Sequence, residues 1–91
     1  MAQALNKKSR IIEFSLHAPD AERVSLAGNF NNWSQKADPM KNGAGTWKKR
    51  IKLETGMYEY KFVVDGEWML DPRCERIVKN ELGGINCIIE V

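Results

Sequence analysis

The sequence predicts a small all-β domain, an antiparallel sandwich of about seven strands in two sheets. Apolar and polar residues alternate along most segments, which is the period of a half-buried strand. Turn residues recur about every eight to twelve residues, and no segment repeats its apolar residues at helical spacing. A chain of 91 residues is long enough for one domain and too short for two.

Five segments carry this alternation. In chain order they are IIEFSL, ended by Ala18-Pro19-Asp20, then ERVSLAG, TWKKRIKL, MYEYKFVVD and CIIEV. The residues expected to face the core are, segment by segment, Ile12, Phe14 and Leu16; Val24 and Leu26; Trp47, Ile51 and Leu53; Tyr58, Tyr60, Phe62 and Val64; and Cys87, Ile89 and Val91. Lys49 falls on the apolar side of its segment, which a strand end or a sheet edge would allow.

The connections are indicated by glycine, proline and aspartate. SQKADPMKNGAG is expected to be a loop with at most a short strand, and residues 71–80 a polar connection. Asp65-Gly66 predicts a two-residue hairpin turn, because both residues tolerate positive φ, so EWML returns beside the preceding strand. The polar and basic residues 1–9 are expected to form a flexible leader before a single domain at 10–91.

Composition limits the class of protein. The net charge of +2 is too close to balance to indicate a nucleic-acid partner. No apolar run approaches the roughly 18 residues of a spanning helix, and the N-terminus lacks a signal-peptide core, so we expect a cytoplasmic protein without a membrane partner.

Cys74 and Cys87 have neither CxxC spacing nor a supporting His pair, so we expect no metal site. Because cytosolic proteins seldom keep a disulfide, we expect two reduced thiols.

The sequence offers no pattern typical of catalysis. His17 is the only histidine, and no nucleophile pattern surrounds it. Asp65, Glu67 and Asp71 resemble a carboxylate cluster, but Asp65 precedes a turn glycine and Asp71 precedes a proline, so turn geometry explains both. Phosphate-binding glycine motifs are absent. We therefore predict that the chain is not an enzyme and holds no cofactor.

The three tryptophans divide into two kinds. Trp47 is in phase with its apolar neighbours and is expected to be buried. Trp33 ends the polar stretch GNFNNW, and Trp68 lies two residues past a hairpin turn, so each is either a lid on the core or an exposed platform. An indole can stack on the apolar face of a pyranose ring, whose hydroxyls then need amide and ammonium partners. The candidates for those partners are Asn31, Asn32, Lys61 and Asn86.

Four segments carry a resemblance to a known family. At VSLAGNFNNW, at GTW of residues 45–47, at GMYEYKFVVDGEW and at LGGIN, the sequence resembles carbohydrate-binding module family 48. These are glycogen-binding domains of the beta subunit of AMP-activated protein kinase and of branching and debranching enzymes. The match runs in order over about residues 11–91. It implies an immunoglobulin-like β-sandwich that binds α-1,4-linked glucan, such as glycogen, starch or maltooligosaccharide, without catalysis.

The resemblance also implies a set of site residues. They are Trp33 and Trp68 as stacking platforms, Lys61 and Asn86 as hydrogen-bonding groups, and Leu82 as an apolar wedge. At one position the chain departs from the family: kinase-type modules commonly have a threonine where this chain has Gly84. One hydroxyl contact is therefore expected to be missing.

A second function class stays open. The same sandwich could dock a kinase or an amylolytic enzyme domain, with the tryptophans as interface anchors, because tryptophan is enriched at interface hot spots. The expected partners are thus an α-glucan, and in the alternative a kinase or a glucan-active enzyme.

Overall fold

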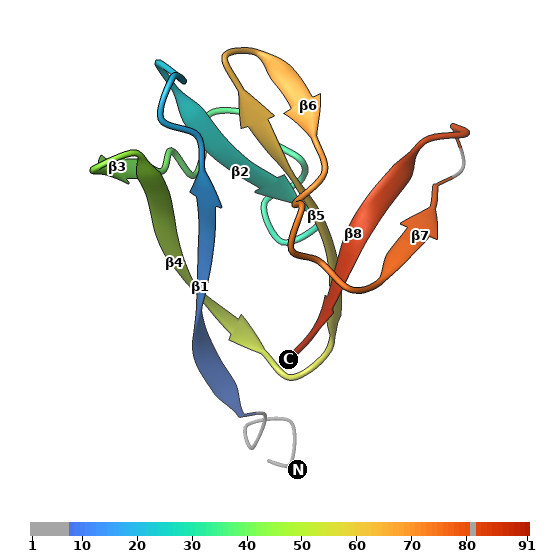
Figure 1. The fold of residues 1–91 in the computed structure, drawn as a ribbon. Coiled ribbons are helices and arrows are strands. Elements are labelled where there is room, and N and C mark those ends of the chain that lie inside the picture. The colour runs from blue at the N-terminus through green and yellow to red at the C-terminus, as the bar shows by residue number, and fades with distance from the viewer. Residues whose placement is uncertain (1–7, 81) are drawn as a thin grey trace, which may run out of the picture.

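The computed structural model describes residues 8–80 and 82–91, and its regular structure is entirely β-strand. The strands are β1 (Ser9–His17), β2 (Val24–Gly28), β3 (Lys41–Gly43), β4 (Thr46–Glu54), β5 (Met57–Val64), β6 (Glu67–Met69), β7 (Ile77–Lys79) and β8 (Ile85–Glu90). They form two antiparallel sheets (Figure 1), one in the order β1-β4-β3 and one in the order β2-β5-β8-β7, with β6 also paired to β5. The predicted all-β antiparallel sandwich is confirmed. In this described part of the chain, no helix is long and apolar enough to cross a membrane.

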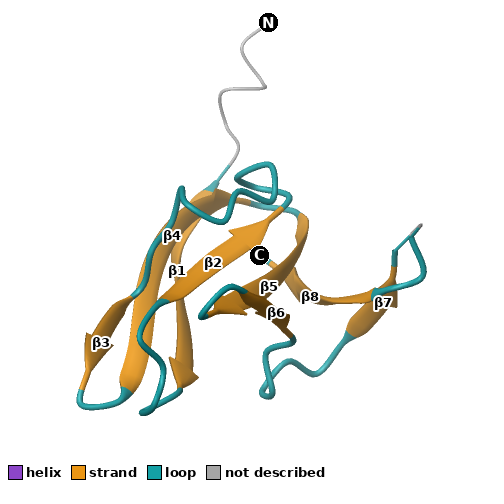
Figure 2. Cartoon of the chain, turned by 90° about the horizontal axis from the view of Figure 1, so that it is seen from above, coloured by secondary structure: helices purple, strands orange, loops and turns teal. Residues whose placement is uncertain are grey.

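The two sheets face each other across one apolar core (Figure 2). The first sheet buries Phe14, Leu16, Trp47 and Leu53, and the second buries Val24, Leu26, Tyr60, Phe62 and Cys87. Trp47 is buried as predicted, and its indole N–H donates to the Ala18 carbonyl at 2.9 Å. The buried indole nitrogen of Trp47 therefore has a hydrogen-bond partner.

Lys49 lies where one side of β4 becomes a sheet edge, which is one of the two positions that the sequence allows for a cation on the apolar side. β3 pairs with only the first residues of β4, up to Lys48. From Lys49 onward that side of β4 has no partner strand among the described residues. The ammonium of Lys49 lies 3.9 Å from the carboxylate of Asp38. Because β3 ends before it reaches Lys49, a charged side chain can lie on the apolar side of β4 at this position.

Two segments differ from the sequence-based expectation. The predicted polar connection at 71–80 contains strand β7, which pairs with β8. Ile77 and Lys79 are exposed and Val78 is only half-buried, so the segment carries no apolar alternation from which to predict a strand. At the N-terminus, β1 begins at Ser9, and residues 1–7 of the predicted leader lie outside the described residues.

Cys74 and Cys87 form a disulfide, with their Cα atoms 6.0 Å apart. The prediction of two reduced cysteines is therefore wrong. The connection after β6 brings Cys74 back over β8, where Cys87 is buried in the core. Spacing along the chain does not reveal this proximity, because β6 and β8 become neighbours only through their shared partner β5.

Candidate functional site

One groove on the second sheet brings together all five residues that the resemblance singles out. Its volume is about 710 Å³, and it is lined by Trp33, Glu59, Lys61, Trp68, Lys79, Asn80, Leu82 and Asn86. These residues are far apart in sequence and converge because β5 is central. β2 pairs with one side of β5, while β6 and β8 share the other side.

The loop that carries Trp33 is held by one asparagine. The Asn31 side chain accepts the Gly28 N–H at 3.0 Å and donates to the Leu26 carbonyl at 3.0 Å and the Asp38 carboxylate at 2.7 Å. The prediction offered Asn31 as a sugar-binding candidate. The structure uses its amide to close the loop instead.

The end of this loop turns through left-handed backbone. Asn32 and Trp33 have φ of 58° and 57°, a region that Asn tolerates better than most residues. The Trp33 N–H donates to the Gly28 carbonyl at 2.8 Å, which closes the turn. A Cβ at Gly28 would lie only 2.5 Å from the Glu59 carbonyl and from the Phe30 ring, so only glycine fits there. GNFNNW is therefore a compact turn that fixes the position of an indole.

Trp68 reaches the same groove from a hairpin. Asp65 and Gly66 both have positive φ, 50° and 89°, and join β5 to β6 by the predicted two-residue turn. Trp68 lies opposite Val63 and is 43% exposed. The ring centroids of Trp33 and Trp68 are 6.3 Å apart, and their planes are inclined by 58°. The two indoles form a tilted aromatic wall, partly open to solvent.

Polar groups lie beside this wall. Lys61 alternates with the buried Tyr60 and Phe62, so its side chain leaves the core on the groove side. Asn86 is only 5% exposed, and its amide donates to the Glu59 carboxylate at 3.0 Å. Glu59 is absent from the sequence-based set. The signal that could have found it is its position two residues before Lys61, on the same face of β5.

The connection from β7 to β8 forms the far rim. Leu82 is 97% exposed, so its apolar side chain is accessible at the rim of the groove. Asn80 also lines the groove and was not predicted; its carboxamide oxygen accepts the N–H groups of Leu82 and Gly84, both at 3.0 Å.

The two aspartates that resemble a catalytic cluster have structural partners. Asp65 accepts the backbone N–H groups of Glu22 and Arg23 at 2.9 and 2.8 Å. Asp71 accepts the Tyr60 hydroxyl at 2.7 Å, and burial together with this carboxylate raises the pKa of the Tyr60 phenol. Neither aspartate lines the groove. In residues 8–80 and 82–91 no cluster of three or more His, Cys, Asp or Glu side chains could hold a metal ion.

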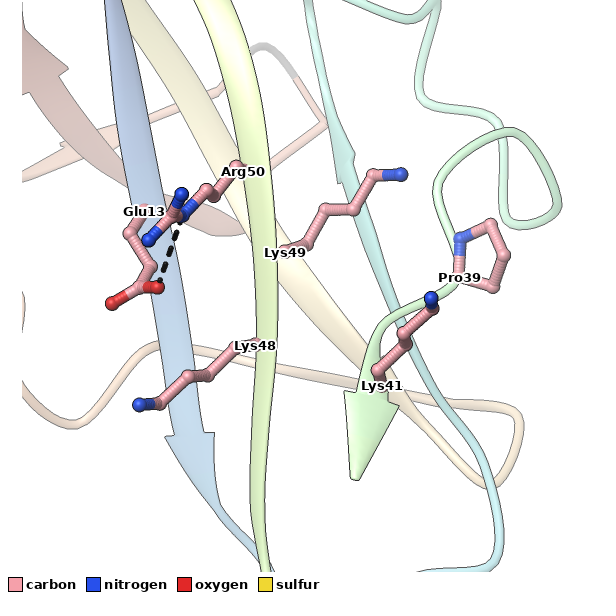
Figure 3. A pocket seen from close by; sticks show the side chains of 6 residues that line it. All are labelled: Glu13, Pro39, Lys41, Lys48, Lys49 and Arg50. Carbon is pink, nitrogen blue, oxygen red and sulfur yellow. Dashed lines mark ion pairs between the residues drawn. The ribbon is translucent and has the colours of Figure 1, made fainter. Parts of the chain in front are cut away.

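A second, smaller hollow of about 350 Å³ lies over the other sheet (Figure 3). It is lined by Glu13, Pro39, Lys41, Lys48, Lys49 and Arg50. The figure shows Arg50 beside Glu13, an exposed ion pair of 3.5 Å. None of the lining residues is aromatic, so this hollow gives a sugar ring no surface for stacking. The basic side chains Lys48, Arg50 and Lys52 are exposed on one face of β4, so this is a solvated sheet face.

The groove of this antiparallel β-sandwich presents tilted indoles beside ammonium, amide and carboxylate groups, a combination that can stack on a sugar ring and hydrogen-bond its hydroxyls. The chain belongs to the family described as the glycogen recognition site of AMP-activated protein kinase, whose family model matches residues 12–91. The family resemblance and the non-catalytic class predicted from the sequence are thereby confirmed.

Curated relatives are beta subunits of that kinase. The beta-1 subunit from Sus scrofa is 40% identical over 70 residues, which are 77% of this chain and 55% of the relative. The beta-1 subunit from Homo sapiens is 41% identical and the beta-2 subunit from Mus musculus 40% identical, each over 77% of this chain and 25% of the relative. The chain thus spans between about a quarter and about half the length of these relatives.

Proposed function

We propose that this domain binds α-1,4-linked glucan, such as glycogen, starch or maltooligosaccharide, through the groove on the second sheet. The observation that carries the proposal is the pair of partly exposed indoles, 6.3 Å apart and inclined by 58°, in the groove that also contains Lys61 and Asn86. Each indole takes the apolar face of one pyranose ring, and both surfaces are then removed from water. Two indole planes that are inclined to each other can stack on successive glucose residues of a glucan that bends.

Hydrogen bonds then orient the glucan. Lys61 offers an ammonium, which donates to hydroxyl oxygens. The Asn86 amide nitrogen already donates to Glu59, which leaves the carboxamide oxygen as the group of Asn86 that can accept a hydroxyl proton. Leu82 adds an exposed apolar side chain at the rim. The groove thus combines apolar, donor and acceptor groups, as a neutral sugar polymer requires.

Single substitutions of the tryptophans test the site. Trp33→Ala and Trp68→Ala are each expected to weaken binding of maltoheptaose or β-cyclodextrin by about 1–3 kcal/mol, the range for stacking of a base on an aromatic side chain. Lys48→Ala on the other sheet is the matched surface control and should leave the affinity unchanged. Calorimetry on the three variants measures the effect. Unchanged binding by the double tryptophan variant would exclude this site.

The alternative is a docking module for a kinase or an amylolytic enzyme domain. The observation that favours it is that the relatives are subunits of a kinase and extend well beyond the matched region. Titration of the chain with maltoheptaose, followed by tryptophan fluorescence, separates the two functions. A lack of response at millimolar sugar supports docking. Sugar binding should also depend little on salt, whereas nucleic-acid binding would weaken steeply. Location in the cytoplasm stays a prediction.

A further inference from the structure

We infer that Asn80 is a sugar-binding residue that donates a hydrogen bond from its carboxamide nitrogen to a glucan hydroxyl. The inference rests on the proposed glucan-binding function and adds a residue to that site. Asn80 follows β7 and lines the same groove as the two indoles.

The orientation of the Asn80 amide is determined by its surroundings. The oxygen accepts two backbone N–H groups, from Leu82 and Gly84, each at 3.0 Å. A nitrogen in that place could not accept them, so the reversed orientation is excluded. The backbone supports the same turn: the Asn80 N–H donates to the Gly84 carbonyl at 2.8 Å, and the Gly83 N–H donates to the Asn80 carbonyl at 3.2 Å. The amide is therefore fixed before any ligand arrives.

The nitrogen of this amide is available. It makes no hydrogen bond to any residue in the described ranges 8–80 and 82–91. An ordered NH2 group that has no acceptor among residues 8–80 and 82–91, at the wall of a groove that also contains Lys61 and Asn86, can donate to a hydroxyl oxygen. Little ordering entropy is lost when such a group binds, because the turn has already ordered it.

Gly84 explains why the amide can lie there. A Cβ at position 84 would be 3.1 Å from the Asn80 nitrogen, closer than side chains normally approach. A side chain at position 84 would therefore require the Asn80 amide to shift by a few tenths of an ångström. Since this chain has glycine at 84, Asn80 supplies the polar group that a residue such as threonine would otherwise place there. The hydroxyl contact expected to be missing is replaced from a neighbouring position.

The direct test is NMR of the unmodified chain with its amide side chains labelled with 15N. On titration with maltoheptaose, the Asn80 side-chain NH2 signals should shift together with the indole N–H signals of Trp33 and Trp68. Indole shifts without a shift of the Asn80 NH2 signals would overturn this inference and leave the proposed function standing. If none of these signals moves, the proposed function itself fails and the inference fails with it.

A charge-bearing isostere gives an independent measurement. Asn80→Asp keeps the oxygen that accepts the loop N–H groups but removes the donor, so affinity for maltoheptaose should fall about three- to tenfold. Asn42→Asp is the matched control, because the Asn42 oxygen similarly accepts the Gly45 N–H, at 2.8 Å, in a hairpin of the other sheet. Affinity of Asn80→Asp within twofold of the control would refute the donor role. If the Leu82 and Gly84 amide signals reveal a changed loop in that variant, the NMR titration of the unmodified chain decides.

Discussion

Asn31→Ala is expected to destabilise the domain by removing the side chain that closes the Trp33 loop. Three hydrogen bonds are lost, to the Gly28 N–H, the Leu26 carbonyl and the Asp38 carboxylate. A neutral hydrogen bond contributes about 1 kcal/mol net and one to a charged group about 1.5–3 kcal/mol. These bonds are only partly buried, so water replaces some of them. The free energy of unfolding should therefore fall by about 2–3 kcal/mol.

Urea unfolding followed by far-ultraviolet circular dichroism measures this loss without relying on Trp33 as the reporter. Asn32→Gly is the control: Asn32 is exposed, its φ is 58°, and glycine tolerates that backbone, so stability should change by less than about 0.5 kcal/mol. Asn31→Ala should also weaken maltoheptaose binding, but less than Trp33→Ala does, because the indole is loosened rather than removed. Equal stabilities of the two asparagine variants would refute the structural role assigned to Asn31.

Three further predictions concern the scaffold. Gly28→Ala should lower stability by about 1–3 kcal/mol in thermal unfolding, because its Cβ would overlap the backbone of β5; an unchanged melting temperature would contradict this. Reduction of the Cys74–Cys87 disulfide should cost about 3 kcal/mol in urea unfolding with and without dithiothreitol, from the chain entropy of the loop that it closes; equal curves would show that the bond does not form in solution. Because burial and the Asp71 carboxylate raise the pKa of Tyr60, the folded state holds this proton more tightly than the unfolded chain, so stability is full below about pH 10 and falls at higher pH. The Tyr60→Phe variant should have a lower free energy of unfolding at neutral pH, and that free energy should fall less steeply above about pH 10 than in the unmodified chain. The same slope in both proteins would exclude Tyr60 as the cause of the alkaline destabilisation.

Period-two alternation was sufficient to predict the architecture where the strands are half-buried. Phe14, Leu16, Tyr60 and Phe62 face the core as the pattern indicates. The same rule could not find β7, since its side chains are mostly exposed and its pairing with β8 is made by backbone groups alone. Exposed strands leave no hydrophobic signal in a sequence.

The site was predicted in a different way. Periodicity showed only that Lys61 leaves the core and that Trp33 and Trp68 lie outside regular alternation; their roles came from the family resemblance. Asn31 and Asn80 show what neither route could provide. Both are asparagines in loops. The Asn31 amide forms hydrogen bonds through its oxygen and its nitrogen, whereas within residues 8–80 and 82–91 the Asn80 amide forms them through its oxygen only. That difference depends on which backbone groups the folded loop places nearby.

The branching of the second sheet at β5 sets the dimensions of the groove. β5 pairs with β8 up to Tyr60 and with β6 from Phe62, so Lys61 lies between the two pairings. Along β5, Trp68 is level with Val63, and Asn86, one residue beyond the Tyr60–Cys87 pair, is level with Lys61. Trp68 and Asn86 are therefore about two residues apart along the strand direction, or roughly 7 Å. The pairing register of β5 thus sets the distance between the side chains that we propose to contact the glucan. A one-residue slip of the β6 hairpin would change that distance although no residue of the sequence had changed.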